Sequence, residues 1–170
     1  MKKIYFTALL FSIVTGFLHA QDDSSTLVRV GDSAPAFTCA TIDGKTIDIS
    51  KLNGKIILIN FFATWCPPCL AELPELQKDI WEPYSDRSDF VLLIVGREHT
   101  QAEVEAFIEK KKFTMPFVPD PNREIFKLYA TQNIPRNVVI GKDGKILFQS
   151  MGYSEEEFIK LKELLAKVLD

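Results

Sequence analysis

Two cysteines three positions apart, Cys66 and Cys69, are the residues of this chain with the clearest chemical potential. They follow an apolar run, 56–62, that has the length of a buried strand, and they open a stretch with a helical pattern. Two thiols one helical turn apart can close a disulfide with little backbone movement. A helix N-terminus also stabilises a thiolate, because its unpaired N–H groups and its dipole favour negative charge. The spacing therefore predicts thiol–disulfide exchange.

The two cysteines are expected to play different parts. Cys66 stands at the helix start, is expected to face solvent and should be the attacking thiolate. Cys69, one turn further in, should be the resolving thiol. Between them, Pro67 and Pro68 supply no cation and no side-chain donor. The lack of a cation favours a higher pKa of the Cys66 thiol and a more reducing couple.

Zinc binding is the main alternative use of such a pair, and it would need two more ligands. The chain offers only Cys39 and His99, plus His19 in a segment that we expect to be removed. We therefore expect neither a metal nor a cofactor. A static structural disulfide is a second alternative, and the flanking Trp65 and the proline pair argue against it.

The composition indicates one globular domain. The chain has 170 residues, of which 46% are hydrophobic, enough to bury a core. Its formal charge is −3, and no basic cluster interleaved with aromatic residues is present, which argues against a nucleic-acid partner.

The N-terminus has the pattern of an export signal. Lys2 and Lys3 precede an uncharged, mostly apolar stretch, 4–18, and Ala20 offers a cleavage position. Export would place the dithiol in the periplasm, where it needs a supply of electrons; an uncleaved membrane anchor is the alternative. The predicted divisions are a signal peptide at 1–20, a flexible leader at 21–29 and one domain at 30–170.

Strand and helix patterns alternate along that domain. The predicted strands are 37–41 and 45–49, joined as a hairpin, then 56–62, 90–95, 117–118, 136–140 and 145–150. The predicted helices are 67–80, 100–112, 121–129 and one that begins at Ser154 and runs to the C-terminus. This order predicts an α/β fold whose sheet is covered on both faces and has an antiparallel hairpin at one edge. The dithiol then lies at the carboxyl end of a central strand, where such sheets place their sites.

The run Asn-Phe-Phe-Ala-Thr-Trp-Cys-Pro-Pro-Cys at 60–69, with Glu72 and Pro74 after it, closely resembles the thioredoxin-like proteins of the TlpA/ResA type. Asp-Gly-Lys at 43–45, Leu-Asn-Gly-Lys at 52–55 and Ile-Pro at 134–135 also match that family of exported bacterial oxidoreductases. The resemblance covers about residues 30–168. It implies a thioredoxin-like fold: a central mixed β-sheet flanked by helices, with an N-terminal β-hairpin and a central insertion, placed around 98–120.

The resemblance also implies a base for the resolving step. Cytosolic thioredoxins carry a buried aspartate where this chain has Asn60, which cannot take a proton. Glu72 lies three residues after Cys69, on the same helical face, and matches a functional glutamate of the family. We therefore predict three catalytic residues, Cys66, Cys69 and Glu72. The alternative for Glu72 is a solvated acid near the helix N-terminus.

A substrate groove beside the dithiol is implied as well. Pro135 should adopt a cis peptide that exposes backbone for pairing with substrate; the alternative is an ordinary trans turn. Trp65 should cover the dithiol, although it could instead pack in the core. The predicted groove residues are Trp65, Pro67, Pro68, Ile134 and Pro135. The chain departs from the family after Pro135, because Arg136 and Asn137 replace two threonine-like residues. That position would line the substrate groove, so the family's substrate preference does not carry over.

The resulting prediction is an exported thiol–disulfide oxidoreductase that reduces protein disulfides, including those of apocytochrome c, and is re-reduced by a membrane electron donor. A disulfide-forming oxidase and a copper-binding thioredoxin-fold module that would use His99 are the alternatives left open. A peroxidase is disfavoured because its Pro-x-x-x-Thr-x-x-Cys pattern is absent.

Two further residues receive simpler interpretations. Cys39 alternates with Phe37 and Thr41 along a predicted strand, so we expect a buried small hydrophobic residue rather than a third redox thiol. His99 has no ligand or acid partner at an informative spacing, and we expect an ordinary loop residue.

Overall fold

The computed structural model describes residues 24–170 of the chain. The predicted signal peptide, 1–20, lies outside the described residues, and the proposed domain boundaries stay predictions. Residues 25–27, in the segment predicted as a leader, are hydrogen-bonded to the chain near 129–131: the Leu27 N–H donates to the Tyr129 carbonyl and the Thr131 N–H to the Ser25 carbonyl. None of the helices between residues 24 and 170 has the length and apolar character needed to cross a bilayer.

Within residues 24–170, one mixed sheet of five strands forms the centre of the fold, in the order β5-β4-β3-β6-β7. Neighbours β3, β4 and β5 run parallel, whereas β6 is antiparallel to both β3 and β7. The strands are β3 (Ile56–Phe62), β4 (Phe90–Arg97), β5 (Phe117–Asp120), β6 (Arg136–Ile140) and β7 (Ile146–Met151). This is the predicted α/β class with a central mixed sheet.

The middle strand, β3, is buried along its whole length. Side chains alternate between the two faces of a strand, so Leu58 and Phe62 enter the apolar core on one face while Ile59 and Phe61 enter the core on the other. Asn60 lies on the same face as Leu58 and Phe62. The pleat of β3 thus places one buried polar side chain against the helices that cover that face.

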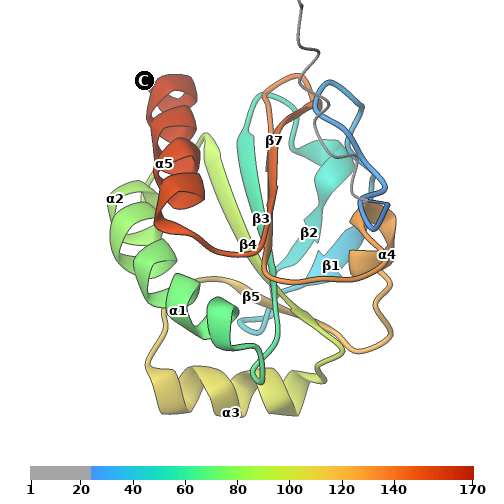
Figure 1. Ribbon diagram of the computed structural model, residues 1–170, viewed down its shortest axis with the longest axis vertical. Coiled ribbons are helices and arrows are strands. Elements are labelled where there is room, and N and C mark those ends of the chain that lie inside the picture. The colour runs from blue at the N-terminus through green and yellow to red at the C-terminus, as the bar shows by residue number, and fades with distance from the viewer. Residues whose placement is uncertain (1–23) are drawn as a thin grey trace, which may run out of the picture.

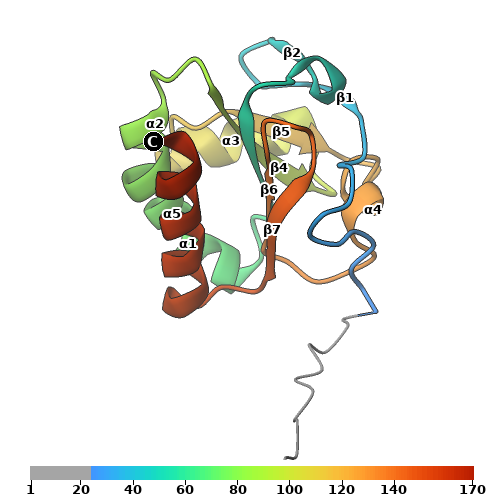
Figure 2. The same ribbon diagram turned by 90° about the horizontal axis from the view of Figure 1, so that it is seen from above.

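Helices cover one face of the sheet, and the hairpin with a short helix covers the other (Figures 1 and 2). The helices are α1 (Pro67–Leu76), α2 (Glu82–Tyr84), α3 (Gln101–Lys111), α4 (Phe126–Tyr129) and α5 (Glu155–Leu169). Beside α1 and α2 in both views, α5 buries the apolar side of its surface, including Phe158, Leu161 and Leu165. Each such side chain contributes about 1.5–3 kcal/mol by leaving water.

The predicted N-terminal hairpin forms a separate two-stranded sheet, β1 (Thr38–Ala40) with β2 (Thr46–Asp48). Its turn contains Gly44 at φ 83°, a left-handed conformation that glycine adopts without steric cost. A single turn of 3-10 helix, η1 (Ile49–Lys51), then leads toward β3. The predicted insertion corresponds to α3 and β5, which follow β4.

Two helices differ from their predicted bounds. The helix that begins after Cys66 continues beyond 80, because α1 passes into a π-helical segment, η2 (Gln77–Trp81), and then into α2. The helix predicted over 121–129 is helical only in α4, so that prediction was wrong for its first half. Arg123 has a left-handed φ of 58°, and the Asp120 carboxylate accepts hydrogen bonds from the N–H groups of Ile125 and Phe126, which starts the helix later.

Candidate active site

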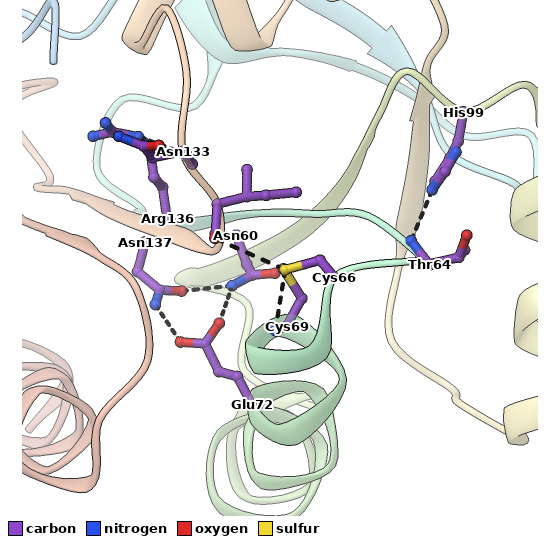
Figure 3. The surroundings of a disulfide bond; sticks show 10 residues. Asn60, Thr64, Cys66, Cys69, Glu72, His99, Asn133, Arg136 and Asn137 are labelled. Carbon is purple, nitrogen blue, oxygen red and sulfur yellow. Dashed lines mark hydrogen bonds between the residues drawn. A yellow bond between two sulfur atoms is a disulfide. The ribbon is translucent and has the colours of Figure 1, made fainter. Parts of the chain in front are cut away.

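The dithiol follows β3 and lies at the N-terminus of α1 (Figure 3). Cys66 is the N-cap residue and is joined to Cys69 by a disulfide, with their Cα atoms 5.3 Å apart. The Cys69 N–H donates a hydrogen bond of 3.3 Å to the Cys66 sulfur. Proline suits the first helical turn because the N–H that it lacks would have no partner within the helix. Pro67 and Pro68 therefore start α1 without cost to its hydrogen bonding.

Both cysteines are buried. Cys69 is fully buried in the core beneath α1 and Cys66 is 4% exposed, so the expectation that Cys66 faces solvent is wrong. The loop before β6 accounts for this, because the Ile134 carbonyl oxygen lies 3.8 Å from the Cys66 sulfur. Next to the cysteines, Trp65 is 60% exposed and both Pro67 and Pro68 are exposed. Trp65 is therefore not a core residue, and the surface around Cys66 is apolar.

The loop before β6 closes over the dithiol from the other side. The Ile134–Pro135 peptide is cis, as the resemblance implied. The carbonyl oxygen of Ile134 lies 3.8 Å from the Cys66 sulfur. Pro135 is buried and Ile134 is half-buried. The predicted groove residues thus lie on both sides of the Cys66 sulfur, on the α1 N-terminus and on the cis-proline loop.

Behind the disulfide, Glu72 is 2% exposed, so the alternative of a solvated acid is wrong. Its two carboxylate oxygens each accept one amide hydrogen bond, from Asn60 at 2.9 Å and from Asn137 at 2.6 Å. The Asn60 amide also donates to the Asn137 side-chain oxygen at 2.9 Å. Figure 3 shows the three polar side chains gathered beside the first turns of α1, on the inner side of the cysteines.

Burial raises the pKa of Glu72 to about 7, against the opposing effect of the hydrogen bonds from Asn137 and Asn60, which favour the carboxylate. A carboxyl group with a pKa near neutrality can take up and release a proton at physiological pH. The arrangement therefore sets a buried carboxyl group with a raised pKa three residues after the buried Cys69 on α1.

Asn137 is the member of this cluster that the sequence did not identify. Residues 60 and 137 are directly opposite each other in the antiparallel pairing of β3 with β6, which brings both amides to one face of the sheet. The sequence showed that residue 137 departs from the threonine-like residue of the family. Only the register of β3 with β6 shows that Asn137 lies beside Asn60 and Glu72.

Arg136 does not line the groove, contrary to the prediction for that position. It is 4% exposed, and strand alternation turns it to the face opposite Asn137, away from the disulfide in Figure 3. Its guanidinium donates to the carbonyls of Gln132 and Asn133 and to the hydroxyl groups of Ser25 and Thr26. Arg136 thus ties the loop before the cis-proline to the start of the described chain.

The remaining candidates lie away from the sulfurs. Cys39 is free and 8% exposed, and burial raises the pKa of its thiol to about 11, which fits a buried apolar residue. His99 lies in a loop as predicted, yet its ring is buried and contacts the backbone at Thr64 and Glu98. In the part of the chain from 24 onward, no group of three or more His, Cys, Asp or Glu side chains is arranged to hold a metal ion.

The chain is similar in sequence to known proteins. The Redoxin family matches residues 29–167. The thiol-disulfide oxidoreductase ResA of Oceanobacillus iheyensis is 34% identical over 147 residues, which cover 84% of this chain and 73% of the relative. ResA of Bacillus cereus is 27% identical over 161 residues, covering 95% and 88% of the two chains.

Solved structures agree in fold. A Bacteroides thetaiotaomicron protein proposed to be a protein disulfide isomerase superimposes with a TM-score of 0.82 at 38% identity, covering 85% of this chain and 92% of that one. StoA of Bacillus subtilis gives a TM-score of 0.64 at 29% identity, with coverage of 76% and 97%. The predicted thioredoxin-like resemblance is confirmed. The chain therefore belongs to the Redoxin family and is a thiol–disulfide oxidoreductase related to ResA.

Proposed function

We propose that this protein is an exported reductase of protein disulfides in which Cys66 attacks, Cys69 resolves and Glu72 accepts the proton of the resolving thiol. The observation that carries the proposal is a buried carboxyl group with a pKa near 7, held by two amides behind a dithiol at a helix N-terminus. A dithiol of this kind can transfer two electrons to another disulfide, and the carboxyl group can accept and release the accompanying proton.

The first step is attack by the Cys66 thiolate on a substrate disulfide. A mixed disulfide forms between Cys66 and one substrate sulfur, and the other substrate sulfur leaves as a thiolate and takes up a proton. The Cys69 N–H, aligned on the Cys66 sulfur at 3.3 Å, stabilises that thiolate before the attack.

The second step is resolution by Cys69. Its thiol is fully buried, and burial disfavours the thiolate, so a nearby proton acceptor is needed. Glu72 takes the proton, the Cys69 thiolate attacks the Cys66 sulfur, and the second substrate thiolate leaves. The product is the Cys66–Cys69 disulfide, and the substrate has gained two electrons and two protons. Asn60 cannot serve as the acceptor, but its amide positions Glu72.

The substrate groove is formed by Trp65, Pro67, Pro68, Ile134 and Pro135 in this proposal. An extended substrate segment would lie on the exposed Trp65 and Pro67 side and pair with backbone freed by the cis peptide before Pro135. The distance of 3.8 Å between the Ile134 carbonyl oxygen and the Cys66 sulfur supports this assignment.

The direction of electron flow is supported by the residues between the cysteines. Pro67 and Pro68 add no cation next to the Cys66 sulfur, so the reduced form receives less stabilisation than in a strong oxidant. A reductase outside the cytosol must have its disulfide reduced again after each turnover, so a membrane protein that reduces thiol–disulfide pairs is the expected electron donor. The signal-like segment at 1–20 supports a periplasmic location, with an uncleaved anchor as the alternative. Apocytochrome c is the substrate that the family resemblance favours.

The reduction potential of the Cys66–Cys69 couple tests the proposal. Purified protein is equilibrated with thiol redox buffers, and the two forms are separated after acid quenching. A value near about −270 mV or lower, where thioredoxin lies, would support a reductase. A value near about −120 mV would make the protein a disulfide donor and reverse the proposed direction.

The copper-binding alternative would need His99 as a ligand. Its Nε2 atom accepts a hydrogen bond from the Thr64 N–H, and its Nδ1 atom lies 3.2 Å from the Glu98 carbonyl oxygen. Both ring nitrogens are therefore engaged, and the redox function is the one that the geometry supports.

A further inference from the structure

We infer that His99 is a positioning residue that holds the backbone in front of Cys66 and so keeps the attacking thiol aligned on the N-terminus of α1. The histidine is 4% exposed, and its Nε2 atom lies 2.8 Å from the backbone nitrogen of Thr64, two residues before Cys66 (Figure 3). The inference rests on the proposed role of Cys66 as the attacking thiol. It assigns a function to a residue just after the carboxyl end of β4, which lies beside the carboxyl end of β3.

The two contacts of the ring determine where its proton lies. The Thr64 N–H can only donate, so Nε2 must be the acceptor and carries no proton. Nδ1 faces the carbonyl oxygen of Glu98 at 3.2 Å, and a carbonyl can only accept, so Nδ1 carries the proton. Neutral histidine in this one tautomer satisfies both backbone groups. A side chain without an acceptor at the Nε2 position would leave the Thr64 N–H without this partner.

The fold makes room for the ring in a specific way. Glu98 has a left-handed φ of 62°, and the His99 N–H donates to the Gly96 carbonyl, so the chain turns back sharply at the end of β4. A Cβ atom at Gly96 would lie 3.3 Å from the His99 Cβ and 3.1 Å from a methyl group of Val104. The absence of a side chain at Gly96 therefore leaves room for His99 beside the end of β3.

The ring also packs against the end of β3. Its centroid lies 6.0 Å from that of Phe62 in an edge-on arrangement. Thr64 and exposed Trp65 are the only residues between the buried Ala63 and the N-cap Cys66. The hydrogen bond to Thr64 therefore restrains the short segment on which both Trp65 and the attacking sulfur depend.

Loss of this restraint should act on the sulfur through its alignment. The Cys66 thiolate is stabilised by the N-terminus of α1, including the Cys69 N–H at 3.3 Å, and that effect weakens steeply as the geometry loosens. The disulfide form carries no thiolate and gains nothing from it. Removing the His99 acceptor should therefore raise the pKa of the Cys66 thiol and make the couple more reducing.

Three variants separate positioning from packing. His99→Phe keeps an aromatic ring against Phe62 but has no acceptor, and His99→Gln offers an amide oxygen near the position of Nε2. Val104→Ala, which removes buried volume from α3 near Gly96, is a destabilised control, because the valine side chain cannot accept a hydrogen bond from Thr64. Each reduced protein is alkylated with iodoacetamide between pH 5 and 9, the modified cysteine is identified by mass spectrometry, and thermal unfolding is recorded in parallel.

His99→Phe should slow alkylation of Cys66 at neutral pH by about three- to tenfold, the worth of one backbone hydrogen bond, and shift its pH profile upward. His99→Gln should recover most of the wild-type rate. Val104→Ala should lower the unfolding temperature and leave the Cys66 profile unchanged. A Cys66 profile in His99→Phe equal to that of wild type would overturn the inference, since the ring would then serve packing alone. Equal loss in His99→Gln and His99→Phe would do the same.

The same data keep the two proposals apart. Preferential alkylation of Cys69 in the wild-type protein would contradict the proposed roles of the cysteines, whatever the variants of His99 show. Preferential alkylation of Cys66 with no effect of His99→Phe would contradict only the positioning role.

Discussion

Asn137 donates a hydrogen bond of 2.6 Å to Glu72, although the two residues are 65 positions apart in the sequence. Asn137 lies on β6, two residues after the cis-proline, and Glu72 lies on α1, three residues after Cys69. The bond joins the strand that follows the proposed substrate loop to the helix that carries the dithiol. The donor nitrogen of asparagine lies one bond further from the backbone than the hydroxyl of threonine. Asn137 therefore reaches further toward Glu72 than the threonine-like residue that the family resemblance implies.

Glu72→Gln should slow turnover with a protein disulfide at pH 7 by on the order of 10²-fold, the usual contribution of a positioned base. The amide keeps the size of the side chain but cannot take the proton of Cys69. The rate should also lose its dependence on pH near 7. Stopped-flow measurement of mixed-disulfide resolution gives both quantities. Glu75→Gln, a half-buried acid one turn further along α1, is the matched control, and equal kinetics in the two variants would exclude Glu72 as the base.

Asn137→Ala should raise the pKa of Glu72 further, because it removes a donor that stabilises the carboxylate. A hydrogen bond to a charged group is worth about 1.5 kcal/mol at the least, which corresponds to about one pKa unit. The pKa that defines the acidic limb of the pH–rate profile should therefore rise by about one unit. Ser150→Ala removes a hydroxyl that Asn137 contacts at 3.5 Å and leaves Glu72 untouched, so its profile should not move. Equal pH–rate profiles for Asn137→Ala and Ser150→Ala would contradict the effect of Asn137 on the pKa of Glu72.

The oxidised protein should lose stability as the pH rises from about 4.5 to about 7. The pKa of Glu72 is raised from 4.5 to about 7 in the folded state, so the folded state binds more protons than the unfolded state in that window. The free energy of unfolding therefore falls with rising pH, by about 3 kcal/mol from this group, and changes no further above about pH 8. Below about pH 4 the group is protonated in both states and contributes no loss.

Urea unfolding of oxidised wild type and Glu72→Gln at pH 4.5 and pH 8 checks this expectation. The disulfide is intact throughout, so the site cysteines do not titrate, and groups common to both proteins cancel in the comparison. The variant should lack most of the wild-type loss. Parallel changes in the two proteins would show that Glu72 is not protonated by burial.

Cys39 should stay unmodified in the folded protein. Burial raises the pKa of its thiol to about 11, so its thiolate fraction at pH 8 is about 200-fold below that of a free cysteine. The variant with Cys66→Ser and Cys69→Ser isolates this thiol for labelling with iodoacetamide. Labelling should become fast only after addition of denaturant. Rapid stoichiometric labelling in buffer would revive Cys39 as a third redox thiol.

The sequence by itself was enough for the features that depend on local spacing. Two cysteines one turn apart after a buried strand place a disulfide at a helix N-terminus, and period-two and helical patterns located most elements of the α/β fold within a few residues. The 121–129 helix failed because its start depends on Asp120 and on the left-handed Arg123, which no periodicity reveals.

Only the tertiary structure decided how the site is supported. Glu72 has its raised pKa because α1 packs it against β3, away from water, and Asn137 reaches it because the antiparallel register sets residue 137 opposite residue 60. His99 meets Thr64 across 35 positions because β4 lies beside β3 and the chain turns back after Gly96. Burial and strand register are properties of the assembled sheet. The pattern of residues along the chain therefore identifies the reactive side chains, whereas the burial and hydrogen bonds that set their pKa values come from the tertiary structure.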